Sequence, residues 1–235
     1  MTKLKKPQIL GFIPARGGSK GIPRKNLVPV AGKPLISYTF EQALLSTKLT
    51  RIVLSTDDAE IANLGNSYGI EVPYLRPEEI SGDSVPIEAA LIHALNWLSD
   101  NQGYRPDIFA ILQPTTPLRT AKHIDEAICL LERSGLDAVV SVSPPREHPS
   151  EMVYFEDKIM QFVLKGAGYA FGEQRQDYVE CYFVNGAVYA TLTKAFQRTG
   201  SRFGETTIPY VMKALESIDI DTEDDRMTAE LMISA

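Results

Sequence analysis

The chain has 235 residues, a formal net charge of −6, 44% hydrophobic residues and 23% charged residues. These values are ordinary for a globular protein, so they exclude a disordered or fibrous chain, and the acidic balance argues against a nucleic-acid polymer as a partner. The longest apolar runs, such as residues 138–142, are far shorter than the ~20 residues of a membrane span, so we expect no membrane segment.

The start of the chain and the cysteines indicate the compartment. The apolar stretch that ends at Pro14 is only about five residues long, too short for a secretory leader, so we expect a mature cytoplasmic protein. The two cysteines, Cys129 and Cys181, have neither the number of a disulfide framework nor the spacing of metal ligands.

The first 143 residues alternate between short apolar runs and segments with helical periodicity. Buried strands are expected at residues 8–13, 51–55, 70–73, 108–112 and 138–143. Helices are expected to begin at Pro34, at Thr56 or Asp57, at Pro86 and at Thr120. This alternation predicts an α/β fold, a three-layer, doubly wound and mostly parallel sheet with helices on both faces.

The pattern changes after Pro149. Residues 153–192 favour short strands and turns, as in an arm or an antiparallel insertion, and residues 208–212 predict a strand that returns to the sheet. Thr222 and Asp225 have the capping-box spacing of a last helix that extends to Met232. Because no repeat or linker divides the chain, we expect one domain over residues 1–235.

Unusual residues follow the predicted strands at their carboxyl ends, where ligands bind in such folds. Residues 14–26, PARGGSKGIPRKN, follow the first strand. Their glycines let backbone N–H groups converge on an anion, and their basic side chains suit a polyphosphate. The segment has neither the P-loop spacing nor the Rossmann glycine spacing. From these residues alone, a phosphate site and a solvated surface loop both stay open.

Asp219 and Asp221 lie between a predicted extended segment and a capped helix. Residues two apart in an extended chain point to the same side, so both carboxylates can face one hard cation. Mg²⁺ favours one or two carboxylates together with phosphate oxygens. The alternative is that one of the two aspartates only assists the start of the helix.

The opening motif IPARGGSKGIPRKN resembles that of the acylneuraminate (CMP-sialic acid, or nonulosonic acid) cytidylyltransferases. Six further motifs follow in the order of that family: STDD, LRPEEISGD, LQPTTPLR, RQ, FVNGAVY and SIDIDTEDD. The resemblance covers about residues 9–232. It implies a nucleotidyltransferase-like Rossmann variant, a single cytidylyltransferase domain over 1–235 with a dimerisation insertion at about 149–184.

The resemblance also implies a reaction, the Mg²⁺-dependent transfer of CMP from CTP to the anomeric hydroxyl of a nine-carbon sialic-type sugar acid, with release of pyrophosphate. N-acetylneuraminate or a legionaminate-like acid is the expected acceptor, and Mn²⁺ is an alternative cation. Cytidylyltransferases for pseudaminate or KDO stay open as alternatives. Less favoured are a glycosyltransferase that uses the D-x-D pair and a nucleotide-binding protein without catalysis.

By resemblance, Arg16, Lys20 and Asp221 are catalytic, and Asp219 and Asp221 bind the metal. The residues implied for the nucleotide are Arg16, Gly17, Gly18, Ser19, Lys25, Asn26 and Arg76. The residues implied for the sugar acid are Gln113, Arg175, Gln176 and Asn185. Arg119 stays open between a substrate contact and a structural ion pair.

One position departs from the family pattern. Members that use N-acetylneuraminate often carry a basic residue shortly after the His-Pro step, which acts across a dimer. Here His148 and Pro149 are followed by Ser150 and Glu151. An acid cannot take that role, so the sugar stays open. The many aromatic residues between about Pro149 and Val184 predict a homodimer, because a small insertion cannot bury them alone.

Overall fold

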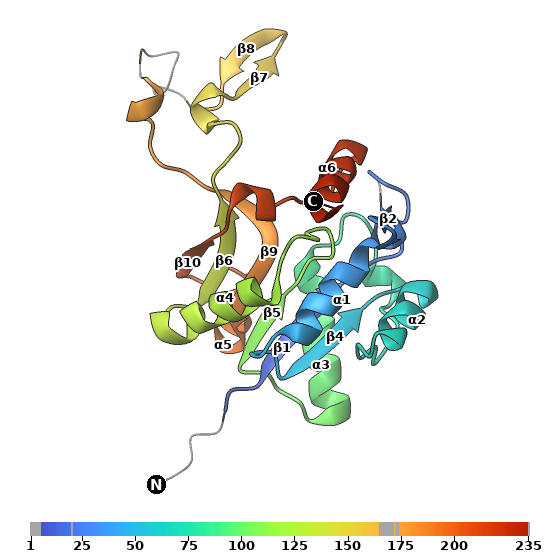
Figure 1. Ribbon diagram of the computed structural model, residues 1–235. Coiled ribbons are helices and arrows are strands. Elements are labelled where there is room, and N and C mark those ends of the chain that lie inside the picture. Colours follow the sequence, from blue (N-terminus) through green and yellow to red (C-terminus); the bar gives the residue numbers. More distant parts are fainter. Residues whose placement is uncertain (1–5, 20, 165–171, 173, 235) are drawn as a thin grey trace.

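The structure is a computed structural model that describes residues 6–19, 21–164, 172 and 174–234. A six-stranded sheet forms its centre, in the order β10-β6-β9-β5-β1-β4 (Figure 1). The strands are β1 (Ile9–Pro14), β4 (Arg51–Ser55), β5 (Ile108–Ile111), β6 (Ala138–Ser143), β9 (Phe183–Leu192) and β10 (Thr207–Val211).

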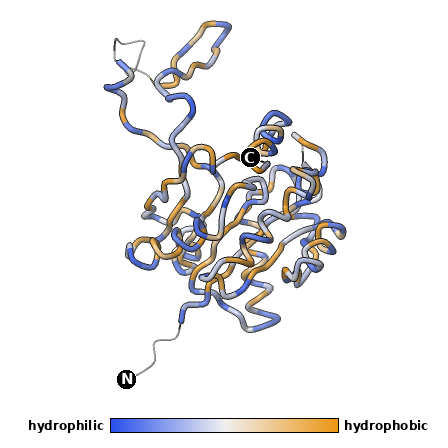
Figure 2. The backbone as a smooth tube through the Cα atoms, in the orientation of Figure 1, coloured by the Kyte–Doolittle hydropathy of each residue, from blue (hydrophilic) through white to orange (hydrophobic). Residues whose placement is uncertain are grey.

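Helices cover both faces of this sheet. α1 (Leu35–Leu45), α2 (Ala59–Ser67) and α4 (Ala121–Ser134) share one hydrophobic core with Ile9 and Ile13 of β1. α3 (Ile87–Gln102) and α5 (Thr193–Thr199) share the other with Leu10 and Phe12. Because neighbouring residues of a strand point to opposite faces, β1 contributes to both cores. The three-layer prediction is therefore confirmed, and Figure 2 shows the hydrophobic residues along the central strands.

The sheet is mostly parallel, as predicted, with one reversed strand near its middle. β1 pairs in parallel with β4 and β5, and β10 pairs in parallel with β6. β9 lies between β5 and β6 and is antiparallel to both. The short strands and turns expected there are thus wrong for residues 183–192, which form one strand that is buried from Asn185 to Thr191.

Two local expectations are also corrected. Residues 70–73 do not form a strand of the sheet, and this segment makes only isolated bridges, Val53 with Glu71 and Thr56 with Leu75. Pro73 contributes to this outcome because it has no N–H group to donate. The cap of α2 is Asp58, whose carboxylate accepts from the N–H groups of Glu60 and Ile61. Its predecessor Asp57 is therefore available for the contacts described below.

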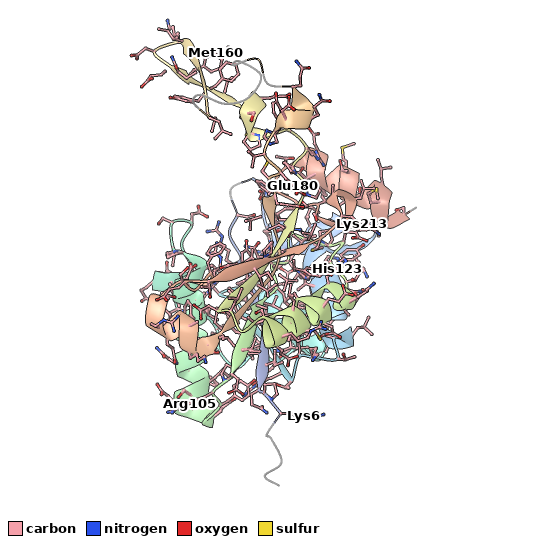
Figure 3. The ribbon with its side chains drawn as sticks, turned by 90° about the vertical axis from the view of Figure 1, so that its left-hand side faces the viewer. Lys6, Arg105, His123, Met160, Glu180 and Lys213 are labelled. Atoms are coloured by element: carbon pink, nitrogen blue, oxygen red, sulfur yellow. The ribbon has the colours of Figure 1, made fainter. Side chains whose placement is uncertain are left out.

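The segment between β6 and β9 forms an arm that projects from the sheet (Figure 1). It contains the 3₁₀ turn η3 (Pro149–Glu151), a hairpin of β7 (Val153–Glu156) and β8 (Ile159–Phe162), and η5 (Arg175–Asp177). Figure 3 shows Met160 at the far end of this hairpin, away from the body of the molecule. All four residues of β7 are exposed, so the hairpin buries little surface in its own chain.

The last elements return to the basic segment and to the sheet edge. η6 (Ala214–Glu216) follows β10, and α6 (Glu223–Ser234) packs against β2 (Pro29–Val30), which pairs with β3 (Lys33–Pro34). Two further 3₁₀ turns lie near the basic segment. η1 (Lys25–Leu27) carries predicted site residues, and η2 (Glu78–Ile80) lies beside them. Among the described residues, no helix is long and apolar enough to cross a membrane.

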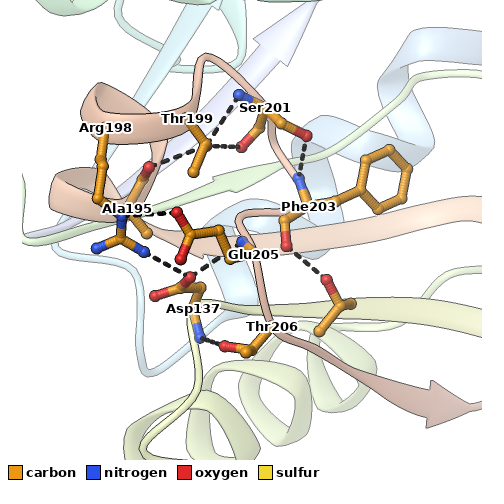
Figure 4. A network of polar contacts seen from close by, with 9 residues as sticks. Asp137, Ala195, Arg198, Thr199, Ser201, Phe203, Glu205 and Thr206 are labelled. Carbon is orange, nitrogen blue, oxygen red and sulfur yellow. Dashed lines mark hydrogen bonds and ion pairs between the residues drawn. The ribbon is translucent and has the colours of Figure 1, made fainter.

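Asp137 fixes the connection between α5 and β10 at the amino end of β6 (Figure 4). Its carboxylate accepts from Glu205 N at 3.0 Å and from Arg198 Nη2 at 2.8 Å. The Glu205 N–H group, together with the Arg198 charge, lowers the pKa of Asp137. This network is structural and lies at the opposite end of the strands from the cavity described next.

Candidate active site

A cavity of about 360 Å³ opens at the carboxyl ends of β1 and β5. Its walls come from the basic segment (residues 14–26), from residues 76–90, from residues 113–115 after β5, and from Asp219 and Asp221. The fold therefore collects side chains from both ends of the chain at the place where such sheets bind ligands. The predicted site residues that line the cavity are Arg16, Gly18, Ser19, Lys25, Asn26, Arg76, Gln113, Asp219 and Asp221.

Each cation of the cavity is paired with a carboxylate from another segment. Arg16 Nη1 lies 2.6 Å from Asp83 Oδ1, and Lys25 Nζ lies 2.7 Å from Asp221 Oδ1. Among the described lining residues, three cations (Arg16, Lys25 and Arg76) face three carboxylates (Asp83, Asp219 and Asp221). The net charge of these groups is close to zero, so they cannot neutralise a triphosphate by themselves.

Arg76 differs from the other two cations because it is buried. Its side chain is 7% exposed, and its Nη2 lies 3.5 Å from Asp57 Oδ1. Burial, opposed by the Asp57 charge, lowers the pKa of Arg76. Its Nε is buried and has no hydrogen-bond partner within the part of the chain that the structure describes. An unsatisfied buried donor is costly. A polar ligand in this cavity that accepts a hydrogen bond from Arg76 Nε would remove that cost.

The glycines of the basic segment permit close backbone contacts. A Cβ on Gly17 would lie 2.7 Å from Asp58 Oδ2, and a Cβ on Gly21 would lie 2.5 Å from the Asp221 carbonyl oxygen. Gly17 N also donates to Asp57 Oδ1 at 3.0 Å. The segment is thus pressed between the start of α2 and the Asp221 segment, with no room for side chains at these two positions.

Two polar residues hold the basic segment in shape. Asn26 Nδ2 donates to the Arg16 carbonyl oxygen at 2.8 Å, and Ser19 Oγ accepts from Lys25 N at 3.1 Å while it donates to Ile22 O. Both residues therefore position Arg16 and Lys25 as well as lining the cavity. Lys20, predicted as catalytic, lies outside the described residues.

Asp219 and Asp221 have different environments. Burial raises the pKa of Asp219, and the Asp221 charge adds to this shift, whereas a hydrogen bond from Thr115 and the Lys25 charge oppose it. Its Oδ1 is buried and has no hydrogen-bond partner among the described residues. The side chain of Asp221 is 74% exposed and is held by Lys25. The pair thus offers one orphaned buried oxygen and one accessible carboxylate to a ligand in the cavity.

The start of α6 is capped by other residues. Asp225 Oδ2 accepts from Thr222 N at 2.9 Å, and Asp225 N donates to Thr222 Oγ1 at 3.2 Å, which confirms the predicted capping box. The described residues contain no group of three or more His, Cys, Asp or Glu side chains arranged to hold a metal ion. A cation bound by Asp219 and Asp221 therefore needs further oxygens from its ligand, as Mg²⁺ on a nucleotide has.

Gln113 and Gly186 form the wall beside Asp219. A Cβ on Gly186 would lie 2.5 Å from Gln113 Oε1 and 3.3 Å from Asp219 Oδ2, and the φ of Gly186 is +74°. Asn185, predicted to contact the sugar, is buried and does not line the cavity. Its Oδ1 accepts from Ser141 Oγ at 2.6 Å, and its Nδ2 donates to Ser217 Oγ at 2.8 Å. Its contacts in this chain are those of a positioning residue.

Of the predicted pair Arg175 and Gln176, the structure shows that Gln176 does not line the cavity of its own chain. Both lie in η5 of the arm, where Gln176 is exposed and the side chain of Arg175 lies outside the described residues. In the same arm, His148 Nδ1 accepts from Ser150 N at 3.1 Å, and its ring stacks on Tyr178 with 4.6 Å between centroids. His148 therefore has a structural role at the start of η3.

Arg119 is the functional candidate that sequence reasoning left undecided. Its side chain is buried and does not line the cavity, and it forms no ion pair with any described residue. Both alternatives left open for it, a substrate contact and a structural ion pair, are therefore wrong within the described chain. Its burial gave no signal in the sequence, because it depends on contacts with Thr39 and Ala187, which are distant in the chain.

An α/β sheet that collects a basic glycine-containing segment and an aspartate pair in one cavity defines a nucleotide-binding protein of the nucleotidyltransferase class. The chain belongs to the cytidylyltransferase family, whose model, described as "Cytidylyltransferase", matches residues 10–181. This confirms the resemblance drawn from the motifs.

Curated relatives agree with this assignment. The chain is 34% identical over 228 residues to an N-acylneuraminate cytidylyltransferase of Escherichia coli O18:K1:H7, which covers 97% of this chain and 52% of the relative. The chain thus spans about half the length of that relative. It is also 34% identical to a CMP-N,N'-diacetyllegionaminic acid synthase of Legionella pneumophila, with 96% of both chains covered. A pseudaminic acid cytidylyltransferase of Campylobacter jejuni is 32% identical, with 95% of both covered.

Solved structures support the fold. A CMP:2-keto-3-deoxy-manno-octonic acid synthetase complexed with CTP superposes with a TM-score of 0.71 at 16% identity, over 97% of this chain and 98% of that chain. The 4-diphosphocytidyl-2C-methyl-D-erythritol synthase of Anaerococcus prevotii superposes with a TM-score of 0.69 at 15% identity, over 98% and 100%. The predicted α/β architecture is therefore shared with these two solved structures.

Proposed function

We propose that the protein transfers CMP from CTP to the anomeric hydroxyl of a nine-carbon sialic-type sugar acid. In this reaction the sugar oxygen forms a bond to the α-phosphorus, the bond between the α- and β-phosphates breaks, pyrophosphate leaves and the hydroxyl proton is released. The observation that carries the proposal is one cavity in which Arg16 and Lys25 lie opposite Asp219, within a chain of the cytidylyltransferase family.

The roles of the side chains follow from their charges. Arg16 and Lys25 bind the triphosphate, and the glycine-containing backbone between them gives it access. The buried Nε of Arg76 donates a hydrogen bond to a polar group of the nucleotide. Gln113 contacts the sugar acid from the opposite wall. Phosphoryl transfer demands mainly positioning and neutralisation of charge, which these groups supply.

We propose Mg²⁺ as the cofactor, with Mn²⁺ as an alternative. The orphaned Oδ1 of Asp219 and the accessible carboxylate of Asp221 fit a hard cation that also takes phosphate oxygens. When bound, the cation would supply the positive charge that the near-neutral set of lining groups lacks. Asp219 and Asp221 would hold it, and Lys25 would then be released from Asp221 toward the phosphates.

The identity of the sugar is the finer part of the proposal. Relatives named for N-acylneuraminate, legionaminic acid and pseudaminic acid share 32–34% identity with this chain, so identity does not separate them. Glu151 stands where N-acetylneuraminate users often carry a basic residue, which favours a legionaminate-like acid. No observation favours the glycosyltransferase alternative, because the family transfers cytidylyl groups.

The experiment measures pyrophosphate release from CTP with four acceptors, N-acetylneuraminate, N,N'-diacetyllegionaminate, pseudaminate and KDO, with and without Mg²⁺. We expect Mg²⁺-dependent release with one of the first two acids and no comparable release when UTP replaces CTP. Release only with pseudaminate or KDO would change the acceptor. No release with any acid, or equal rates with UTP, would overturn the proposal.

We also propose a homodimer formed through the arm and a cytoplasmic location. The arm exposes large apolar side chains, and its η5 residue Gln176, predicted for the sugar acid, does not line the cavity of its own chain. A second copy of this chain would cover the exposed apolar side chains of the arm, and its cavity would receive the η5 residues. The exposed apolar residues are Phe155, Ile159, Met160, Val179 and Phe183. Light scattering should give twice the chain mass of 26.0 kDa, and a stable monomer at micromolar concentration would contradict the dimer.

A further inference from the structure

Arg119 is a buried cation that lies behind the cavity wall. Arg119 is only 1% exposed, and burial lowers the pKa of its guanidinium to about 9. No acidic side chain of the described residues forms an ion pair that would offset this shift. Burying a guanidinium is strongly unfavourable unless its donors are satisfied. A neutral side chain would fill the same space without this loss of stability. The burial of a guanidinium here therefore indicates that its hydrogen bonds hold the surrounding segments in place.

The guanidinium joins three elements through hydrogen bonds. Nη1 donates to the Gln113 carbonyl oxygen at 2.8 Å, to Thr116 Oγ1 at 2.8 Å and to the Ala187 carbonyl oxygen at 3.0 Å. Nη2 donates to Thr39 Oγ1 at 2.5 Å. Arg119 thereby ties α1 and β9 to the segment that follows β5, in a planar fork that few other side chains can provide.

Two of these acceptors adjoin the wall of the cavity. Gln113 is itself a lining residue, and Ala187 follows Gly186, on which a Cβ would lie 2.5 Å from Gln113 Oε1. A shift of either segment by a fraction of an ångström would change where the Gln113 amide points. Among the described residues, no hydrogen bond joins Arg119 to Arg16 or Lys25, so its network supports the Gln113 side of the cavity.

We propose that Arg119 is a positioning residue that holds Gln113 against Gly186, so that its loss impairs use of the sugar acid more than binding of CTP. The inference rests on the proposed function for the identity of the ligand at Gln113. The placement of Gln113 itself is independent of that function and can be measured without substrate.

The test compares Arg119→Lys with Thr39→Val. Lysine keeps a cation but has one donor centre, which cannot reach both Gln113 and Thr39. Thr39→Val removes only the hydrogen bond to α1 and leaves the two carbonyl contacts, so it is the matched control for stability. The readouts are the melting temperature, CTP affinity by calorimetry with Mg²⁺, kinetics with N-acetylneuraminate and N,N'-diacetyllegionaminate, and amide hydrogen exchange of residues 113–116.

For Arg119→Lys we expect the KM for the sugar acid to rise about tenfold or more, while the Kd for CTP stays within about threefold. Hydrogen exchange of residues 113–116 should increase in this variant and stay near the wild-type rate in Thr39→Val. If Arg119→Lys does not fold, Thr116→Val removes one acceptor and should shift the same KM in the same direction by a smaller factor.

Three results would overturn the inference: unchanged exchange at residues 113–116, an unchanged KM for the sugar acid, or an equal loss of CTP and sugar affinity. If the wild-type protein turns over neither acid, the proposed function fails instead, and the exchange measurement still decides whether Arg119 positions Gln113.

Discussion

Arg16 and Lys25 each hold a carboxylate where the proposal places a phosphate. Asp83 approaches Arg16 from the segment that precedes α3, and Asp221 approaches Lys25 from the far end of the chain. Partly exposed ion pairs of this kind are worth little, typically ~0.2–1 kcal/mol. A charged ligand can therefore replace either pair at small cost, and the two pairs keep the cavity ordered until it does.

Asp83→Asn should strengthen CTP binding. The change removes one negative charge beside Arg16 and leaves the shape of the residue, so a phosphate no longer competes with a carboxylate. An ion pair worth ~0.2–1 kcal/mol corresponds to a decrease in Kd of about 1.5- to 5-fold. Calorimetry with CTP and Mg²⁺ measures it. A weaker affinity would mean that Asp83 assists the ligand, for example through the cation.

Asp221→Asn should nearly abolish turnover without unfolding the protein. Asparagine keeps the shape but removes a charge from the proposed cation site, and a single electrostatic stabiliser is worth on the order of 10²–10³ in rate. The melting temperature should change little, because the exposed carboxylate makes one side-chain contact among the described residues, the ion pair with Lys25. Kinetics across a Mg²⁺ series and a thermal melt give both values.

The matched control for that variant is Asp225→Ala. Asp225 caps α6 without lining the cavity, and its Oδ2 also accepts from Asp221 N at 3.2 Å, so its loss should cost ~0.5–2 kcal/mol of stability and lower the rate far less than the loss of the Asp221 charge. If instead Asp221→Asn unfolds the protein and the folded remainder stays active, the aspartate pair is structural.

Asp219→Asn should stabilise the metal-free protein, and the gain should depend on pH. Burial raises the pKa of Asp219, so the folded protein holds this proton more tightly than the unfolded chain. The ionised carboxylate therefore lowers stability at a pH above its folded pKa, and this penalty fades as the pH falls toward 3.8, the ordinary pKa of an aspartate.

Thermal melts in the presence of a chelator check the sign. The melting temperature of the variant should exceed that of the wild type by about 2–4 °C for each kcal/mol relieved at about pH 8, and by less at about pH 5. Mg²⁺ should raise the melting temperature of the wild type and not that of the variant. A variant that is less stable at the higher pH would show that Asp219 is satisfied in the folded protein.

At the scale of elements, β9 supports the cavity from behind, because its Gly186 lies against the lining residue Gln113. Gly186→Ala should cost stability and rate together, because the φ of +74° strains an L-residue and the new Cβ would lie 2.5 Å from Gln113 Oε1. Gly200→Ala is the matched control, since its φ is +70° but nothing lies within 4 Å of its Cβ position.

Backbone strain alone should cost Gly200→Ala about 1 kcal/mol and leave the rate unchanged. Gly186→Ala should lose more stability than this, and its KM for the sugar acid should rise. Equal losses of stability with an unchanged KM would show that Gln113 moves aside freely. The measurements are chemical denaturation and steady-state kinetics.

The elements that the sequence predicts well are those whose burial is local. The runs at residues 9–14, 51–55, 108–111 and 138–143 are mostly apolar, as strands between two helix layers must be, and the structure has strands there. β9 was not predicted as one strand because its partners, β5 and β6, are distant in sequence and it enters between them in reverse. Its register also shifts between Val140 and Val142, which no local pattern indicates.

At the scale of the whole molecule, the site is assembled by the topology. The basic segment and the Asp219–Asp221 pair were found by their composition, but the contact between Lys25 and Asp221 joins residues 196 positions apart. The buried hydrogen-bond hub at Arg119 and the structural use of Asn185 likewise depend on tertiary packing. Motifs thus identified which residues matter, whereas their division into ligand-binding and positioning residues required the structure.

The two halves of the proposed site lie in different parts of the chain, and a mixing experiment tests whether two copies share them. Asp221→Asn disables the cavity, and Arg175→Ala disables the arm. If the arm of one copy serves the cavity of the other, a heterodimer of these variants contains one site built entirely from unchanged residues and one site with both changes. Random exchange makes half of the dimers mixed, so activity should recover to roughly 25% of the wild-type value.

If each arm serves its own cavity, every site in the mixture carries one change and no activity should return. Mixing each variant with itself is the control, and the exchange of subunits is followed by mass spectrometry of a labelled copy, so that a lack of recovery in a fully exchanged sample would show that the arm does not act across the dimer.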